Sequence, residues 1–180
     1  MCEDTQRVGL LGLGSNVGER RAQLQRAVDA LRGAGVTVLA CSSTYDTDPV
    51  GEVTDQPSFL NACVRVQTAL EPLALLDAVK RLEVELGRAG DGVRHGPRSI
   101  DIDILLLGDL ELTDERMTLP HAQLLTRRFV LIPALELDFE LQIRARPPGL
   151  GIVRLADALP ELSLEEGVRW SGPPLRVPQD

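Results

Sequence analysis

Two aspartates separated by a single residue carry the clearest chemical signal in this sequence. Asp101 and Asp103 lie in residues 96–104, a segment that begins as a turn and continues as an isoleucine-rich strand. Side chains alternate between the two faces of a strand, so both carboxylates project from one face while the isoleucines enter a core. Two like charges this close repel each other unless a cation lies between them. Divalent cations such as Mg²⁺ prefer oxygen ligands and commonly take one or two carboxylates together with substrate phosphates.

Arginines accompany this pair along the sequence. Lys80 is the only lysine, so almost all of the positive charge is arginine. Six arginines fall in the same region of the chain: Arg88, Arg94, Arg98, Arg116, Arg127 and Arg128. The planar guanidinium group pairs well with phosphate, so we expect Arg98 to meet phosphate charge that the metal leaves uncovered. An ordinary solvated surface is the alternative for the arginines taken alone.

Composition bounds the kind of protein. The 180 residues are 43% hydrophobic and 26% charged, which predicts a single globular domain over residues 1–180. Within it we expect a core at about 7–140, the span of the family resemblance described below, and a variable extension over 141–180. The net charge of −8 argues against nucleic acid or an anionic membrane as a partner. The acidic start has no signal-peptide pattern, and no apolar run approaches the ~20 residues of a membrane helix, so we expect a cytoplasmic protein with reduced cysteines. The length is compatible with a monomer, which is the state we expect.

The elements that must position these residues follow from hydrophobic periodicity. We expect strands at 8–13, 36–45, 59–69 and 100–107, and helices at 19–32 and from residue 72 to a stop at Gly87. Segments rich in turn-forming residues, at 46–58 and 88–97, are expected to be loops. The resulting βαββαβ order, with right-handed crossovers, predicts an α+β fold that has one sheet and both helices on one of its faces.

The chain after this core gives weaker signals. A short hairpin is expected after residue 108, and a helix is expected near 126–137. From residue 141 the chain is rich in proline and glycine, and we expect its last ten residues to be mobile.

Other candidate residues admit two interpretations each. The glycine segment 12–16 is similar to a phosphate-binding turn between a strand and a helix, but it lacks P-loop spacing, and an ordinary tight turn is the alternative. Asn61 interrupts an apolar strand, so its amide must find a hydrogen-bond partner, either a planar heterocycle or the backbone. Phe59 and Phe129 need no role beyond a core, and His121 in a loop is uninformative alone.

Taken together, these segments resemble the 6-hydroxymethyl-7,8-dihydropterin pyrophosphokinases of folate biosynthesis. The resemblance covers about residues 8–140 and is carried by the joint order of six motifs: LGLGSN (11–16), YDTDPVG (45–51), QPSFLNA (56–62), GPRSIDID (96–103), LPH (119–121) and RRF (127–129). It implies a ferredoxin-like fold, which agrees with the βαββαβ order. It also implies a diphosphokinase that transfers the β,γ-pyrophosphoryl group of ATP to the hydroxymethyl oxygen of the dihydropterin and releases AMP.

The resemblance further implies roles for individual residues. Asp101 and Asp103 would bind two Mg²⁺ ions that clamp the triphosphate, so no dedicated general base is required. The implied catalytic residues are Arg88, Arg98, Asp101, Asp103 and His121. The implied ATP-binding residues are Glu83, Arg88, Arg94, Arg98, Ile104, Arg116, Thr118 and His121. The implied pterin-binding residues are Thr47, Val50, Phe59, Asn61, Asp101 and Phe129.

Four positions depart from the family pattern. His95 stands where a tryptophan is common, Gly90 where a second loop arginine is, Ala122 where an aromatic is, and Asp48 where a proline is. All of them except Asp48 fall on the ATP side. Because glycine samples more backbone conformations, we expect the 88–97 loop to be poorly ordered without ligand and to fold over bound ATP.

Two other functions stay open on the residues alone. A metal-dependent nucleotidyl- or glycosyltransferase with an Asp-x-Asp pair would explain the carboxylates and arginines, but it would leave Phe59 and Asn61 unused. A non-catalytic module that senses a nucleotide would not need the carboxylate pair.

Overall fold

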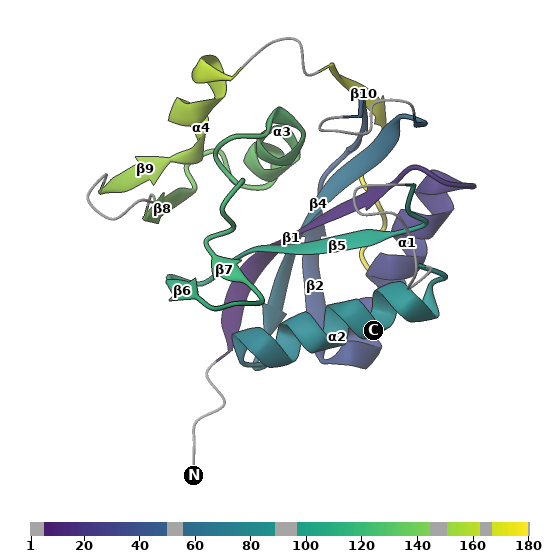
Figure 1. Cartoon of the computed structure of the whole chain (residues 1–180), viewed down its shortest axis with the longest axis horizontal. Coiled ribbons are helices and arrows are strands. Elements are labelled where there is room, and N and C mark those ends of the chain that lie inside the picture. Colours follow the sequence, from purple (N-terminus) through teal and green to yellow (C-terminus); the bar gives the residue numbers. More distant parts are fainter. Residues whose placement is uncertain (1–5, 50–55, 89–96, 145–150, 163–166, 180) are drawn as a thin grey trace.

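The central sheet has six strands, and each pairing within it is antiparallel. The computed structural model describes residues 6–49, 56–88, 97–144, 151–162 and 167–179. The strand order is β10 (Val168–Gly172), β3 (Thr44–Thr47), β4 (Phe59–Thr68), β1 (Arg7–Ser15) and β5 (Asp101–Leu107), and β2 (Val36–Cys41) also pairs with β4. The long strand β4 pairs with β1 along one edge and with β3 and then β2 along the other, so it is the spine of the sheet (Figure 1).

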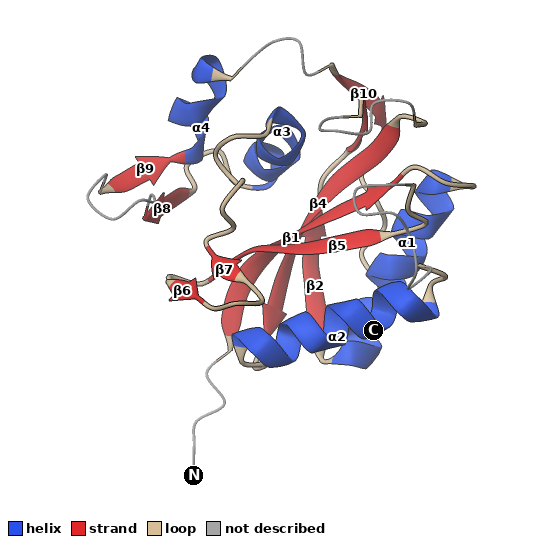
Figure 2. Ribbon diagram, viewed as in Figure 1, coloured by secondary structure: helices blue, strands red, loops and turns tan. Residues whose placement is uncertain are grey.

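Two helices, α1 (Arg20–Leu31) and α2 (Pro72–Glu85), cover one face of this sheet (Figure 2). Apolar residues at helical spacing form their buried stripes: Leu24, Ala27, Val28 and Leu31 on α1, and Leu75, Ala78, Val79 and Leu82 on α2. A short 3₁₀ turn, η1 (Arg32–Ala34), ends at Gly35, whose φ of 79° favours glycine. The predicted βαββαβ order, with both helices on one face, is confirmed except that the second predicted strand is divided into β2 and β3.

The opposite face of the sheet carries a second apolar cluster under α3 (Arg128–Leu137), which agrees with the helix expected near 126–137. Leu10, Cys63 and Leu105 of the sheet pack there against Leu131 of the helix and Leu155. Smaller elements complete this side: β8 (Gln142–Arg144) pairs with β9 (Ile152–Arg154), and α4 (Leu155–Ala158) leads into η2 (Leu159–Glu161). The short strands β6 (Leu112–Thr113) and β7 (Thr118–Leu119) pair with each other and pack instead with the cluster beneath α1 and α2. The hairpin expected after residue 108 is β6–β7.

The single strand predicted at 36–45 is wrong, because the chain is divided there into β2 and β3 by Ser42 and Ser43. Ser42 pairs with Cys63 in an irregular way: its N–H donates to the Cys63 carbonyl at 2.9 Å, and its hydroxyl accepts from the Cys63 N–H at 2.8 Å. A serine hydroxyl thus replaces a backbone carbonyl in the ladder, and the chain changes direction.

The end of the chain also differs from expectation. Leu175 is only 3% exposed and packs in the core beside α1. Gln25 of α1 donates to the Arg176 carbonyl and accepts from the Arg176 N–H, at 2.9 Å each. The prediction of mobile final residues is therefore wrong for this stretch, which is fixed by contacts with residues about 150 positions earlier. Among the described residues, no helix is long and apolar enough to cross a membrane.

Candidate active site

The aspartate pair lies on β5 as predicted, on the face turned away from α1 and α2. Asp101 and Asp103 line a pocket there, while Ile100, Ile102 and Ile104 are at most 5% exposed in the core beneath the helices. Directly across the antiparallel ladder, Gly14 stands opposite Asp101 and Gly12 opposite Asp103. Because these two positions of β1 have no side chains, they leave open space beside the carboxylates.

This register corrects the interpretation of the glycine segment. Gly12 and Gly14 belong to β1, which continues to Ser15, and α1 begins only at Arg20. The segment is therefore neither the expected turn nor a phosphate cradle at a helix N-terminus. Glycines spaced by two on a strand share a face, which is the property that matters here.

Two arginines hold the Asp101 carboxylate. Arg88 Nη1 donates to Oδ1 at 2.7 Å, and Arg98 Nη1 donates to Oδ2. Burial would raise the pKa of Asp101, but the charges of Arg98 and Arg88 outweigh it and hold that pKa below its usual value. Asp101 is therefore a stable carboxylate in the absence of any metal.

Asp103 is in the opposite situation. Burial, and then the neighbouring charge of Asp101, raise the pKa of Asp103 above its usual value. No hydrogen-bond donor reaches its carboxylate within the part of the chain that the structure describes. A divalent cation beside Asp103 would supply the missing positive charge, so the two aspartates fit a metal that takes its remaining ligands from phosphate and water. Over the described ranges, no cluster of three or more metal-ligating side chains exists.

Glu83 on α2 is connected to Asp101 through Arg88, which contacts both carboxylates. Its side chain is 2% exposed and accepts from Lys80 Nζ at 2.8 Å, from the Ile102 N–H at 2.7 Å, and from Arg88. Burial raises the pKa of Glu83, and the Lys80 charge opposes that shift. Glu83 thus fixes the guanidinium of Arg88 beside Asp101, a role in this structure that sequence reasoning did not anticipate.

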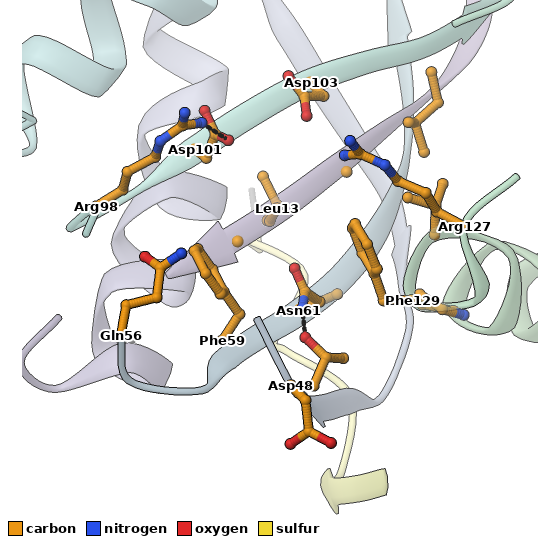
Figure 3. A pocket seen from close by; sticks show the side chains of 17 residues that line it. Leu13, Asp48, Gln56, Phe59, Asn61, Arg98, Asp101, Asp103, Arg127 and Phe129 are labelled. Atoms are coloured by element: carbon orange, nitrogen blue, oxygen red, sulfur yellow. Dashed lines mark hydrogen bonds and ion pairs between the residues drawn. The ribbon is translucent and has the colours of Figure 1, made fainter. Parts of the chain in front are cut away.

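The pocket beside Asp101 has aromatic walls (Figure 3). Phe59 on β4 and Phe129 on α3 stand on opposite sides of it, and Asn61 lies between them. Asn61 Nδ2 donates to Thr47 Oγ1 at 2.6 Å, which leaves the amide oxygen beside Gly14. The sequence-predicted residues Thr47, Phe59, Asn61, Asp101 and Phe129 are therefore brought together around one cavity.

A second groove, called the polar groove here for the charged and hydrogen-bonding side chains in its lining, lies on the other side of Asp103. Ile104, Arg116, Thr118 and His121 line it together with Lys80, Met117 and Ala122, and Asp103 borders both this groove and the aromatic pocket. Arg116 forms an ion pair with Asp77 of α2. Burial lowers the pKa of His121 even though Asp103 opposes the shift. Its Nδ1 accepts from the Gln123 N–H at 3.2 Å, so a neutral ring presents Nε2–H as a donor.

Some predicted features lie outside the described residues. These are Val50, Arg94, His95 and Gly90, and with them the closing motion expected of the 88–97 loop.

Sequence reasoning missed several residues of the site. Gln56 and Arg127 line the aromatic pocket, and the Arg127 guanidinium lies 5.4 Å from the Phe129 ring centroid. Asn16, which is 3% exposed, joins two segments at its edge: its Oδ1 accepts from the Arg98 N–H at 2.7 Å, and its Nδ2 donates to Gln56 Oε1 at 3.1 Å. The sequence did offer a signal for Asn16, because this polar residue directly follows a predicted strand and ends the LGLGSN motif.

An antiparallel α+β domain in which an aromatic pocket and a polar groove meet at Asp103 is typical of a class of protein: enzymes that bring a flat organic molecule against a phosphate-bearing one. Residues 10–139 match the family of 7,8-dihydro-6-hydroxymethylpterin-pyrophosphokinases (HPPK). The chain belongs to this family, and its fold is the ferredoxin-like fold expected from the sequence.

Individual relatives support this assignment. The chain is 44% identical over 139 residues to the 2-amino-4-hydroxy-6-hydroxymethyldihydropteridine pyrophosphokinase of Bacillus subtilis, covering 77% of this chain and 82% of that protein. It is 41% identical over 156 residues to the enzyme of the same name from Pseudomonas aeruginosa, covering 86% and 93%.

Longer relatives contain the same unit as one part. A folate synthesis bifunctional protein of Arabidopsis thaliana is 41% identical over 128 residues, which are 71% of this chain and 26% of that protein. The solved structure of wild-type Plasmodium falciparum HPPK-DHPS superimposes with a TM-score of 0.67 at 15% identity, covering 89% of this chain and 45% of that one. The chain thus spans about a quarter of the plant protein and less than half of the Plasmodium chain.

Proposed function

We propose that this chain transfers the β,γ-pyrophosphoryl group of ATP to the hydroxymethyl oxygen of 6-hydroxymethyl-7,8-dihydropterin and releases AMP, as a step of folate biosynthesis. The observation that carries the proposal is the position of Asp103, which borders both the aromatic pocket and the polar groove. A group held there touches both substrates at once, which a transfer between them requires.

The aromatic pocket suits the pterin. Phe59 and Phe129 offer ring faces on two sides of a flat bicycle, and aromatic stacking supplies contact area with defined geometry. Asn61 can pair with the polar edge of the ring because its orientation is fixed by Thr47. Asp101 at the end of the pocket would lie near the hydroxymethyl group.

The polar groove suits ATP. Arg116, Thr118 and His121 line it. Arg88 and Arg98 are paired with Asp101 beside the aromatic pocket, where the triphosphate would meet the pterin. His121 would donate from Nε2 to a phosphate oxygen, and the arginines would neutralise phosphate charge. Glu83 contributes by holding Arg88, and Arg94 and Val50 remain predicted contacts.

Asp101 and Asp103 would hold Mg²⁺, for which we propose two ions. Bound there, the cations would neutralise the phosphates and acidify the attacking hydroxyl. The new bond joins the hydroxymethyl oxygen to the β-phosphorus, the bond from the β-phosphorus to the α-bridging oxygen breaks, and the hydroxyl proton passes to solvent. The protein's own residues orient the two substrates in line.

We further propose that the chain acts as a cytoplasmic monomer without a nucleic-acid partner. The net charge of −8 argues against a nucleic-acid partner. Light scattering of the purified chain tests the monomer, and a second copy per particle would contradict it.

The test of the reaction measures AMP formed from ATP and Mg²⁺, with and without the hydroxymethyldihydropterin. AMP that requires both pterin and metal supports the proposal. Pyrophosphate release would indicate a nucleotidyltransferase instead. Binding of nucleotide without any turnover would indicate the non-catalytic module, and in that case Asp103→Asn should leave the binding intact.

A further inference from the structure

Strand β10 brings the C-terminal part of the chain to the pterin side of the site. The family match ends at residue 139, and β10 lies well beyond it, yet it pairs with β3: Val168 stands opposite Thr47 and Arg169 opposite Asp46. Without β10, the four-residue strand β3 would be an edge strand whose single strand partner is β4. Short edge strands with one partner open easily.

Asp48, directly after β3, is held by this segment. Arg169 Nη2 lies 2.8 Å from Asp48 Oδ1, and Arg169 Nη1 lies 3.3 Å from Oδ2. The Asp48 N–H also donates to the Gly167 carbonyl at 3.3 Å. Asp48 and Thr47 both line the aromatic pocket, but the Asp48 carboxylate points away from Asn61 (Figure 3). The role of Asp48 is therefore to connect the rim of the aromatic pocket to residues 167–169, and its carboxylate is not placed to contact a ligand in the pocket.

The far end of β10 is fixed to α1. Arg21 donates to Thr44 Oγ1 at 2.9 Å and to the Pro173 carbonyl at 2.9 Å, and the Thr44 hydroxyl lies 3.3 Å from the Gly172 carbonyl. Together with buried Leu175, these contacts make residues 167–176 a strap between the core and the pocket rim.

We propose that this strap is a positioning element of the pterin site, in which Gly167 and Arg169 hold Asp48 and thereby Thr47. Thr47 in turn accepts the hydrogen bond that orients the Asn61 amide. An exposed ion pair alone contributes little, so the effect comes from the position of β3 rather than from charge. The inference rests on the proposed function of the aromatic pocket.

Gly167→Ala tests the strap. A Cβ at Gly167 would lie 2.2 Å from Asp48 Oδ2 and 2.7 Å from Arg169 Nη1, so the ion pair must separate. The matched control is Gly33→Ala, whose Cβ meets nothing within 4 Å. Calorimetric titration of each variant with the hydroxymethyldihydropterin, and separately with an unreactive ATP analogue, should show pterin Kd raised about three- to tenfold for Gly167→Ala alone, and ATP Kd within about twofold of wild type.

Arg169→Ala gives an independent measurement if Gly167→Ala folds poorly, because Arg169 is exposed. We expect pterin binding to weaken in Arg169→Ala and in Asp48→Ala, and the double variant to be no worse than either single one. Unchanged pterin Kd in Gly167→Ala or Arg169→Ala overturns the inference, as does equal weakening of pterin and ATP. A wild-type chain that does not bind the pterin refutes the pocket assignment and the inference with it, so the two failures are distinguishable.

Discussion

Gly14 is expected to be required for pterin binding, although it contributes no side chain. A Cβ at Gly14 would lie 3.0 Å from Asn61 Oδ1 and 3.9 Å from Phe59 Cδ1, so Gly14→Ala forces the amide oxygen to move by a few tenths of an ångström. The amide cannot move freely, because Asn61 Nδ2 is held at 2.6 Å by Thr47 Oγ1. The substitution therefore displaces the polar group that we assign to the pterin edge.

The expected loss is that of one buried polar contact with the pterin. Such a loss costs about 1–3 kcal/mol, which is about a 5- to 150-fold increase in Kd. The fold should be affected less, because the described contacts of the added methyl are side-chain atoms and Gly14 does not have a positive φ. The melting temperature of the variant should stay close to that of wild type.

Calorimetric titration with the hydroxymethyldihydropterin measures this loss. The matched control is Gly12→Ala, two residues earlier on the same face, whose Cβ would have the Leu105 side chain as its nearest neighbour, at an ordinary 3.5 Å. Gly12→Ala should weaken pterin binding less than Gly14→Ala. Wild-type affinity in Gly14→Ala would refute the reasoning, and equal losses in both variants would show that methyl volume, not the Asn61 amide, is responsible.

Three further outcomes are expected. Asp103→Asn should reduce kcat by at least about a hundredfold in a steady-state AMP assay, since an aligned metal supplies several kcal/mol at the transition state, while pterin Kd stays near wild type; retained turnover would contradict the metal role. Arg98→Ala should lower kcat by about ten- to a hundredfold because it removes a charge-assisted contact with phosphate; weaker pterin binding with normal turnover would show that the residue serves the other substrate. Burial, the hydrogen bond to Glu136 and the Glu136 charge raise the pKa of Tyr45 to about 12, so the folded chain keeps a proton that the unfolded chain releases near pH 10. Wild type should therefore lose stability relative to Tyr45→Phe as pH rises from about 10 to 12, as measured by denaturant unfolding; a constant difference between the two would contradict the shift.

Hydrophobic periodicity within short segments correctly predicted the main helices and the orientation of the strand that carries the aspartates. Alternating Asp and Ile in residues 100–104 predicted which face of β5 carries the carboxylates, and helical spacing predicted α1 and α2. The glycine segment was misinterpreted because Gly-x-Gly is more often seen in turns. Here the two glycines lie on a strand, and their lack of side chains leaves room for the carboxylates of the neighbouring strand β5. This arrangement is visible only once Gly14 and Asp101 are known to be neighbours.

Long-range contacts account for most of what the sequence did not predict. The polar, proline-containing end of the chain resembles a loose tail, yet Arg21 and Gln25 bind its backbone carbonyls, which no side-chain pattern in the tail reveals. Asn16 gave a similar difficulty, because its partners Gln56 and Arg98 are 40 and 82 positions away. The walls of the pocket were predicted only because several motifs were interpreted together as a known family.

The ion pairs of Asp101 have a thermodynamic consequence for the order in which the site fills. Arg88 and Arg98 both form ion pairs with this carboxylate, so the positive and negative charges of the site neutralise each other when no ligand is bound. Nucleotide without metal would meet arginines that are already neutralised, and metal without nucleotide would meet a carboxylate that is already occupied. When both arrive, the carboxylate can turn to the cation while the guanidinium groups turn to the phosphates. On the proposed function, binding of the two would then be linked, so that each would raise the affinity for the other by the same factor, and the site would respond to the metal–nucleotide complex rather than to either component.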